Sequence, residues 1–188
     1  MSSRRLRFVL PAVLVLGLVA ASFAIAAGKD HGNSGGTTFS AKLIGHNETP
    51  AVHTAGRGKL ALTVNANNTI SYTLTYSGLN TAAAVAHVHF GQPDVAGGIS
   101  FFLCGGTKPA CPPGNTSTVT PISGTVTTGD VLAISTQGLN ANDMAAIVAE
   151  MRAGFAYANV HTTSSPAGEI RGQLRGHEDD QGDNGDHH

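Results

Sequence analysis

The sequence predicts a mainly β protein, an antiparallel two-sheet β-sandwich with one short helix. Two observations predict this class. Apolar and polar residues alternate with a period of two in short runs separated by Gly, Asn and Pro, and only one segment has helical periodicity. Strands at this spacing with a single helix favour a sandwich of the immunoglobulin-like or superoxide-dismutase-like kind over a fold of alternating strands and helices.

Eight strands are expected in order along the chain: residues 38–44, 59–64, 70–76, 84–90, 99–103, 117–126, 155–161 and 169–175. The second and third form the clearest hairpin, because Asn65-Ala-Asn-Asn68 between them tolerates left-handed backbone. The helix is expected over residues 142–153, beginning at a capping Asn142 and ending at Gly154. Its apolar stripe consists of Met144, Ile147, Val148 and Met151.

The chain is predicted to contain four segments: a signal peptide (1–27), a flexible linker (28–37), the β-sandwich domain (38–176) and a disordered acidic His-containing tail (177–188). Three arginines precede an apolar stretch from Phe8 to Ala27, which is typical of an export signal. An uncleaved anchor is the alternative, since about twenty apolar residues span a bilayer. If the signal is cleaved, the mature chain has no membrane span. In both cases the domain is extracytoplasmic: secreted, periplasmic or on the cell surface.

Composition limits the classes of partner and activity. Charged residues make up only 12% of the chain and the net charge is −1, so we expect no basic face for nucleic acid. The sequence has no nucleophile elbow, P-loop or dinucleotide fingerprint. We therefore assign no catalytic residue and favour a non-enzyme, with an exported hydrolase as a third interpretation. The acidic tail is expected to be solvated, although it offers groups that collect cations loosely.

Cys104 and Cys111 are the only cysteines, and they flank a Gly/Pro-containing turn. In an oxidising compartment a close pair of this kind predicts a disulfide that constrains a loop. The alternative, a pair of metal thiolates, lacks further cysteine ligands and suits a reducing compartment better.

The histidines suggest the most specific chemistry. His87 and His89 lie two residues apart in a predicted strand, so both side chains project from one face. His161 shares a face with Tyr157 and Asn159 in another strand. If these strands are neighbours, three imidazoles converge into a set that suits copper or zinc and leaves one coordination position open. The alternative is that the histidines bond to loops or lie at the surface.

Charged residues near these strands are interpreted as structural. Glu169 and Arg171 share one strand face, so they can pair with each other, with Arg175 or with a neighbouring strand. Glu48 lies in a polar loop, Gly45 to His53, after the first strand, and this loop also offers His46 and His53 to the histidine strand.

Four motifs occur in a fixed order: Asn47-Glu48-Thr49-Pro50, Tyr72-Thr-Leu-Thr-Tyr76-Ser-Gly78-Leu79, Ala86-His87-Val88-His89-Phe90-Gly91, and Tyr157-Ala-Asn159-Val-His161-Thr162 with Pro166-Ala-Gly168-Glu169-Ile170-Arg171-Gly172. Together they resemble the chordin-domain (CHRD) family over about Phe39 to Arg175. The resemblance implies an extracellular β-sandwich module. It does not imply the growth-factor antagonism of chordin, because this chain has one such module and none of chordin's cysteine-rich repeats.

Two functions follow as expectations. The first is an exported, non-enzymatic binding or structural module, whose partner is an unidentified extracytoplasmic protein or envelope component. No cofactor is assigned with it. The second is a copper- or zinc-binding protein that uses His87, His89 and His161.

Overall fold

The computed structural model describes residues 38–119 and 121–177. The predicted signal peptide, the linker and residues 178–188 of the tail lie outside the described residues. His177, where the tail was expected to begin, lies in the last strand. No helix in the described ranges is long and apolar enough to cross a membrane.

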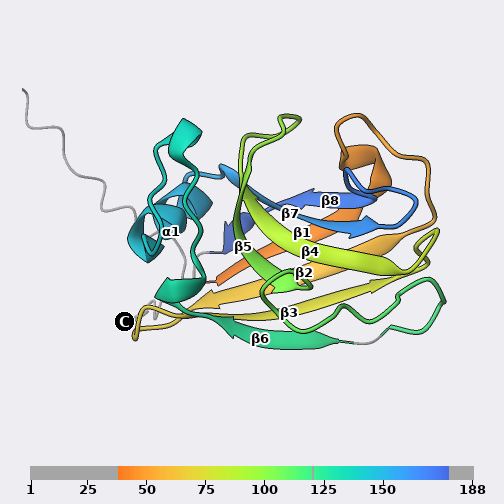
Figure 1. Cartoon of the computed structure of the whole chain (residues 1–188), viewed down its shortest axis with the longest axis horizontal. Coiled ribbons are helices and arrows are strands. Elements are labelled where there is room, and N and C mark those ends of the chain that lie inside the picture. Colours follow the sequence, from red (N-terminus) through yellow and green to blue (C-terminus); the bar gives the residue numbers. More distant parts are fainter. Residues whose placement is uncertain (1–37, 120, 178–188) are drawn as a thin grey trace, which may run out of the picture. The chain divides into compact units, whose positions relative to one another are not determined.

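The described part forms one antiparallel sheet of nine strands in the order β5-β4-β7-β8-β1-β2-β3-β6, with β9 paired to β1 (Figure 1). The strand bounds are β1 Thr38–Ile44, β2 Arg57–Val64, β3 Ile70–Ser77, β4 Ala83–Phe90, β5 Gly98–Cys104, β6 Ile122–Val126, β7 Ala156–Thr162, β8 Ile170–Gln173 and β9 Arg175–His177. The helix α1 spans Met144–Arg152, and three short 3-10 helices span Gly45–Asn47, Thr128–Asp130 and Ser135–Gln137.

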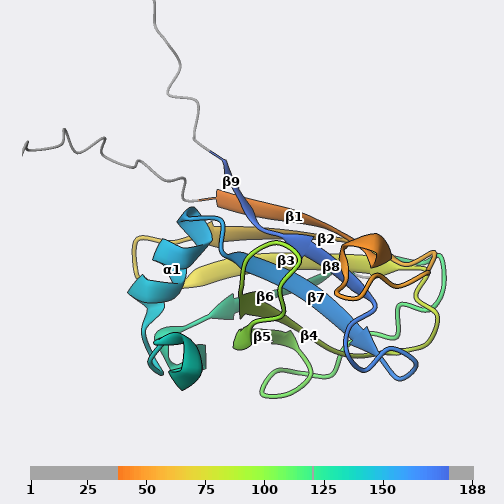
Figure 2. The same cartoon turned by 90° about the horizontal axis from the view of Figure 1, so that it is seen from above.

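The mainly β class with one helix is confirmed, whereas two separate sheets are not. The hydrogen-bonded sheet curls until its two edge strands, β5 and β6, approach each other, which gives a nearly barrel-like arrangement (Figure 2). The Tyr72 hydroxyl donates to the Leu103 carbonyl at 2.7 Å, from β3 to β5. The Leu132 amide donates to the Ser100 carbonyl at 2.8 Å. These two bonds link β5 to β3 and to the segment that follows β6, and no ladder pairs β5 with β6.

Most predicted elements are present, and two strands differ from expectation. The hairpin of β2 and β3 pairs from Arg57 opposite Ser77 to Val64 opposite Ile70. The strand expected over 117–126 begins only at Ile122, because Pro121 before it lacks an amide donor. The strand expected over 169–175 is divided into β8 and β9 at Leu174, whose amide donates to Ala156.

The hydrophobic core fills the inside of the curled sheet. Alternate residues of the strands point inward, and the largest of them are fully buried: Phe39, Leu43, Leu60, Leu74, Phe101 and Ile170. The helix α1 lies at one end of the curl (Figure 1) and buries the predicted stripe of Met144, Ile147, Val148 and Met151. Its N-terminal cap is Asp143 rather than Asn142, since the Asp143 carboxylate accepts from the Ala146 amide at 3.0 Å.

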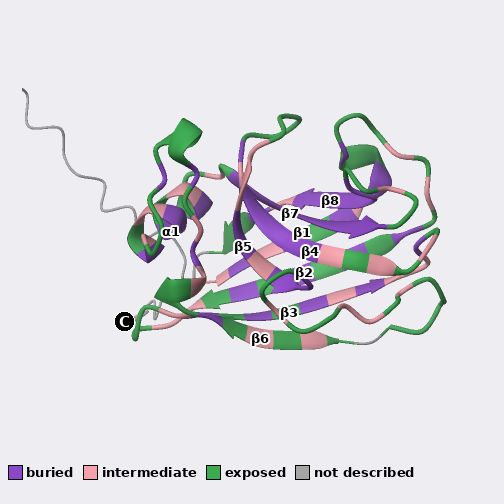
Figure 3. Ribbon diagram, in the orientation of Figure 1, coloured by how far each residue is buried: buried purple, intermediate pink, exposed green. Residues whose placement is uncertain are grey.

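Strand β7 is buried on both faces, which is unusual for a sheet whose outer side faces water. All seven of its residues are buried, including polar ones (Figure 3). The outer faces of β4, β7 and β8 contact the loops over residues 45–56, 91–97 and 163–169. A polar layer therefore lies between this part of the sheet and its loops.

The expected disulfide is confirmed. Cys104, the last residue of β5, is bonded to Cys111, and their Cα atoms lie 5.0 Å apart. The bridge closes the loop that follows β5 and leaves no free cysteine in the described ranges.

We predict that Tyr72→Phe lowers the free energy of unfolding by about 1–2 kcal/mol, because the Leu103 carbonyl loses the donor that joins β5 to β3 across the core. Denaturant unfolding measures this loss. The control is Thr63→Val, which removes an exposed hydroxyl from β2 and should change stability by less than about 0.5 kcal/mol. Equal stability of Tyr72→Phe and the parent would show that this bond between β3 and β5 does not stabilise the curled sheet.

Candidate metal centre

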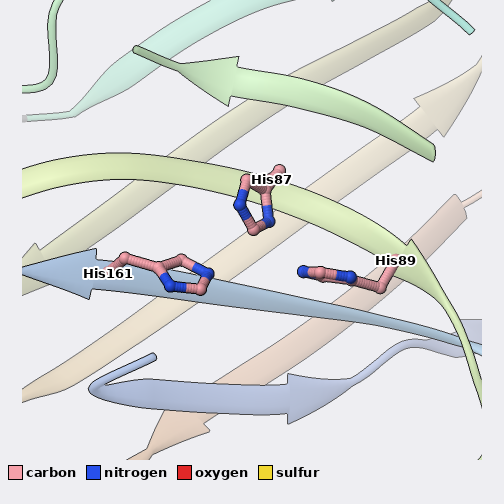
Figure 4. Close-up of side chains that lie close together, drawn as sticks. All are labelled: His87, His89 and His161. Atoms are coloured by element: carbon pink, nitrogen blue, oxygen red, sulfur yellow. The ribbon is translucent and has the colours of Figure 1, made fainter. Parts of the chain in front are cut away.

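Three histidines converge on the outer face of β4 and β7 (Figure 4). His87 and His89 project from the same face of β4, and β7 lies beside β4 with His161 opposite Val85. The ring centroid of His87 lies 4.5 Å from that of His89 and 4.5 Å from that of His161. One nitrogen from each ring can be chosen such that all three lie within 4.8 Å of one another. The pairing of strands on which the predicted cluster depends is therefore present.

The three imidazoles are buried and uncharged near neutral pH. Their exposed fractions are 3% for His87, 8% for His89 and 9% for His161. Burial, together with the neighbouring His89 and His161, lowers the pKa of His87 to about 2. Burial lowers the pKa of His89 to about 4 and also lowers the pKa of His161. Neutral rings carry a lone pair, which metal coordination requires.

Backbone carbonyls determine which nitrogen of two rings faces the cluster. His89 Nδ1 lies 2.8 Å from the Gly97 carbonyl, and His161 Nδ1 lies 2.9 Å from the Pro166 carbonyl. A carbonyl can only accept, so Nδ1 donates in each case and Nε2 keeps its lone pair. Metal-binding histidines usually have this second hydrogen bond, which fixes the tautomer and the ring orientation.

Two nitrogens of the cluster have no hydrogen-bond partner although they are buried. They are His87 Nδ1 and His161 Nε2. Most buried polar atoms in folded proteins are paired, so an unpaired buried atom needs an explanation. A shared ligand between the rings would satisfy both nitrogens.

Asn159 lies within the same layer and contacts the third ring. It is opposite His87 across the β4–β7 pairing, and its side-chain oxygen lies 3.0 Å from His89 Nε2. A neutral His89 has one N–H, which the Gly97 carbonyl accepts. The Asn159 amide group also hydrogen-bonds to the Glu48 carboxylate, so Asn159 links the histidine cluster to Glu48.

Tyr157 and Arg171 form one side of the site. The Tyr157 ring stacks on His89 with centroids 4.6 Å apart and an interplanar angle of 4°. The Arg171 guanidinium carbon lies 3.4 Å from the Tyr157 centroid. Arg171 also donates to the Gln92 and Val95 carbonyls at 3.0 and 2.9 Å, which holds the loop that carries Gly97.

The sequence allowed an ion pair between Glu169 and Arg171, but the structure does not contain it. Each of the two residues binds a different loop. Glu169 is fully buried and accepts from the Thr54 hydroxyl and the Asn80 amide at 2.7 Å and from the Thr162 hydroxyl at 2.6 Å. Its carboxylate thereby joins the loop before β2, the loop after β3 and the end of β7.

Glu48 is buried in the polar layer, whereas His46 and His53 of the same loop are exposed. A Cβ added at Gly168 would lie 2.6 Å from a Glu48 carboxylate oxygen, and Gly168 has a φ of 125°, so only glycine fits there. Burial raises the pKa of Glu48 to about 7, although Arg171, Asn159 and the Thr49 amide act in the opposite direction.

The sequence did not reveal the carbonyls of Gly97 and Pro166 as partners of the histidines. Backbone groups carry no signature in the side-chain pattern. The only available signal was the position of Gly and Pro in the loops that follow β4 and β7.

The comparison with known families supports the resemblance seen in the motifs. The model of the CHRD domain matches residues 39–174. The chain belongs to the CHRD family. In this CHRD domain the matched range begins in β1 and ends at Leu174, so it includes all three histidines and the loops that cover them. No curated protein and no solved structure matches the chain.

We predict that Glu169→Gln lowers the free energy of unfolding by about 2–3 kcal/mol, because one carboxylate oxygen becomes an NH2 group facing a donor. Urea unfolding measures the change. Glu150→Gln on α1 is the matched control and should stay within about 0.5 kcal/mol of the parent. Similar effects of both substitutions would contradict the anchoring role of Glu169.

We also predict that metal-free protein loses stability as the pH falls from 7 to 4.5, by on the order of 2 kcal/mol. The unfolded chain binds protons at its histidines near pH 6.5, whereas burial lowers the pKa of His87 to about 2 and that of His89 to about 4. The histidine contribution is thus complete above pH 6.5 and is lost as the pH falls. Denaturant unfolding in the presence of a chelator at several pH values measures the slope, which His87→Gln should reduce.

Glu48→Gln is the control of opposite sign. Because burial raises the pKa of Glu48 to about 7, the folded protein retains a proton that the unfolded chain releases between pH 4.5 and 7. Acidification therefore favours folding through Glu48 and opposes it through the histidines. Glu48→Gln should make the pH dependence steeper, and a shallower slope would contradict the assignment.

Proposed function

We propose that this CHRD-domain protein is an exported, non-enzymatic module that binds one copper or zinc ion through His87, His89 and His161. One observation carries the proposal. Three neutral imidazoles from adjacent strands offer nitrogens within 4.8 Å of one another, and two ring nitrogens of the cluster are buried without a partner.

The surrounding contacts support a built site rather than a chance cluster. The carbonyls of Gly97 and Pro166 orient two of the rings. Stacking on Tyr157 fixes the plane of the His89 ring. A preorganised ligand set loses less conformational freedom on binding, which favours affinity.

Burial supports a holding role over catalysis. Each histidine is less than one-tenth exposed, so a substrate has little access to the ion without movement of the loops. Two features support an extracytoplasmic location. The chain begins with three arginines followed by an apolar stretch, as export signals do, and the Cys104–Cys111 disulfide is of a kind that persists outside the cytoplasm. We propose that the module contacts a protein or another component of the cell envelope there.

The test is metal content and calorimetric titration with copper and with zinc on the purified chain. We predict one ion per chain, and loss of that ion in His87→Ala/His161→Ala with the fold retained. The matched control is His46→Ala/His53→Ala, which removes two exposed histidines of a loop and should leave binding unchanged. Equal binding by both double variants, or no binding by the parent, would overturn the proposal.

A further inference from the structure

We infer that the site formed by His87, His89 and His161 selects cuprous copper, Cu⁺, over Zn²⁺, because the fold provides three neutral ligands and no anionic ligand among them. This inference rests on the proposed function and specifies its ion. It depends on coordination number, on charge and on one neighbouring side chain.

Coordination number is the first argument. Zinc in proteins is almost always four-coordinate, with either four protein ligands or three and a water molecule. The ligand group here consists of three histidines, and within the described ranges no Cys, Asp or Glu belongs to it. The Phe102 ring meets His87 edge-on at 5.5 Å, and the rings are at most 9% exposed, which limits room for a water ligand. Cu⁺ and Zn²⁺ are both closed-shell ions, but Cu⁺ accepts a lower coordination number, which three nitrogens complete.

Charge is the second argument. A fixed positive charge lies close to the rings, because the Arg171 guanidinium packs on the Tyr157 ring that stacks on His89. Glu169 is fully occupied by three donors, and Glu48 hydrogen-bonds to the Asn159 side chain and faces Arg171, so its carboxyl group is separated from the rings by Asn159. The cost of transferring an ion from water into a protein rises with the square of its charge. A dication without a counter-charge is therefore disfavoured relative to a monocation.

Asn159 is the side chain from which we expect a fourth ligand could be built. Its side-chain oxygen lies 3.0 Å from His89 Nε2, and the residue is only 3% exposed. Aspartate is nearly isosteric with asparagine. A carboxylate there would supply both the fourth ligand and the negative charge that the site lacks for zinc. The neutral amide of Asn159 therefore determines the choice of ion.

The experiment measures both affinities on the purified full chain carrying His187→Ser/His188→Ser, which removes histidines of the tail. Cu⁺ is titrated without oxygen against a chromophoric Cu⁺ chelator, and Zn²⁺ against a chromophoric zinc chelator. We expect Cu⁺ to bind roughly 1,000-fold more tightly than Zn²⁺. Asn159→Asp should raise the Zn²⁺ affinity by about tenfold or more, which corresponds to about 1.4 kcal/mol.

The outcomes separate this inference from the proposed function. Zinc binding as tight as Cu⁺ binding overturns the inference and leaves the proposed function intact, whereas failure to bind either ion overturns both. If Asn159→Asp does not fold, Phe102→Glu places a carboxylate beside His87 from a partly exposed position of β5. Unchanged zinc affinity in a folded carboxylate variant contradicts the charge argument.

Discussion

The pairing of β4 with β7 is the interaction on which the rest of the site depends. Its register places His89 opposite Tyr157, His87 opposite Asn159 and Val85 opposite His161. A shift of one residue would turn every side chain of one strand to the other face, because side chains alternate along a strand. The same register buries Ala86, Val88, Ala158 and Val160 on the inner face, so the hydrophobic core and the histidine cluster require the same pairing.

The polar layer outside β4, β7 and β8 is stable because charged residues bind the loops that cover it. Arg171 holds the loop that carries Gly97, and Glu169 ties three separate segments to the end of β7. The loops in turn supply the carbonyls that orient His89 and His161. The result is a buried, preorganised set of imidazoles at a place where an antiparallel sheet commonly faces water.

The sequence predicted the strands, the hairpin, the disulfide and the three histidines, because each depends on alternation or spacing within a short segment. It did not predict a single curled sheet, since closure depends on bonds between distant residues such as Tyr72 and Leu103. It also allowed an ion pair of Glu169 with Arg171, because strand alternation shows a shared face and not the loops above it. The sequence likewise did not show that Glu48 is buried against Gly168, because that contact forms between two loops that are distant in the chain.

Nitrogen-15 NMR of the histidine side chains, recorded before and after one equivalent of Cu⁺, tests the central claim most directly. The account predicts that His89 and His161 are neutral at pH 7 with the proton on Nδ1, bonded to Gly97 and Pro166. On addition of the ion, Nε2 of both rings and one nitrogen of His87 should shift while the Nδ1 protons remain. Protons on Nε2 in the metal-free protein, or rings that do not respond to the ion, would contradict the account.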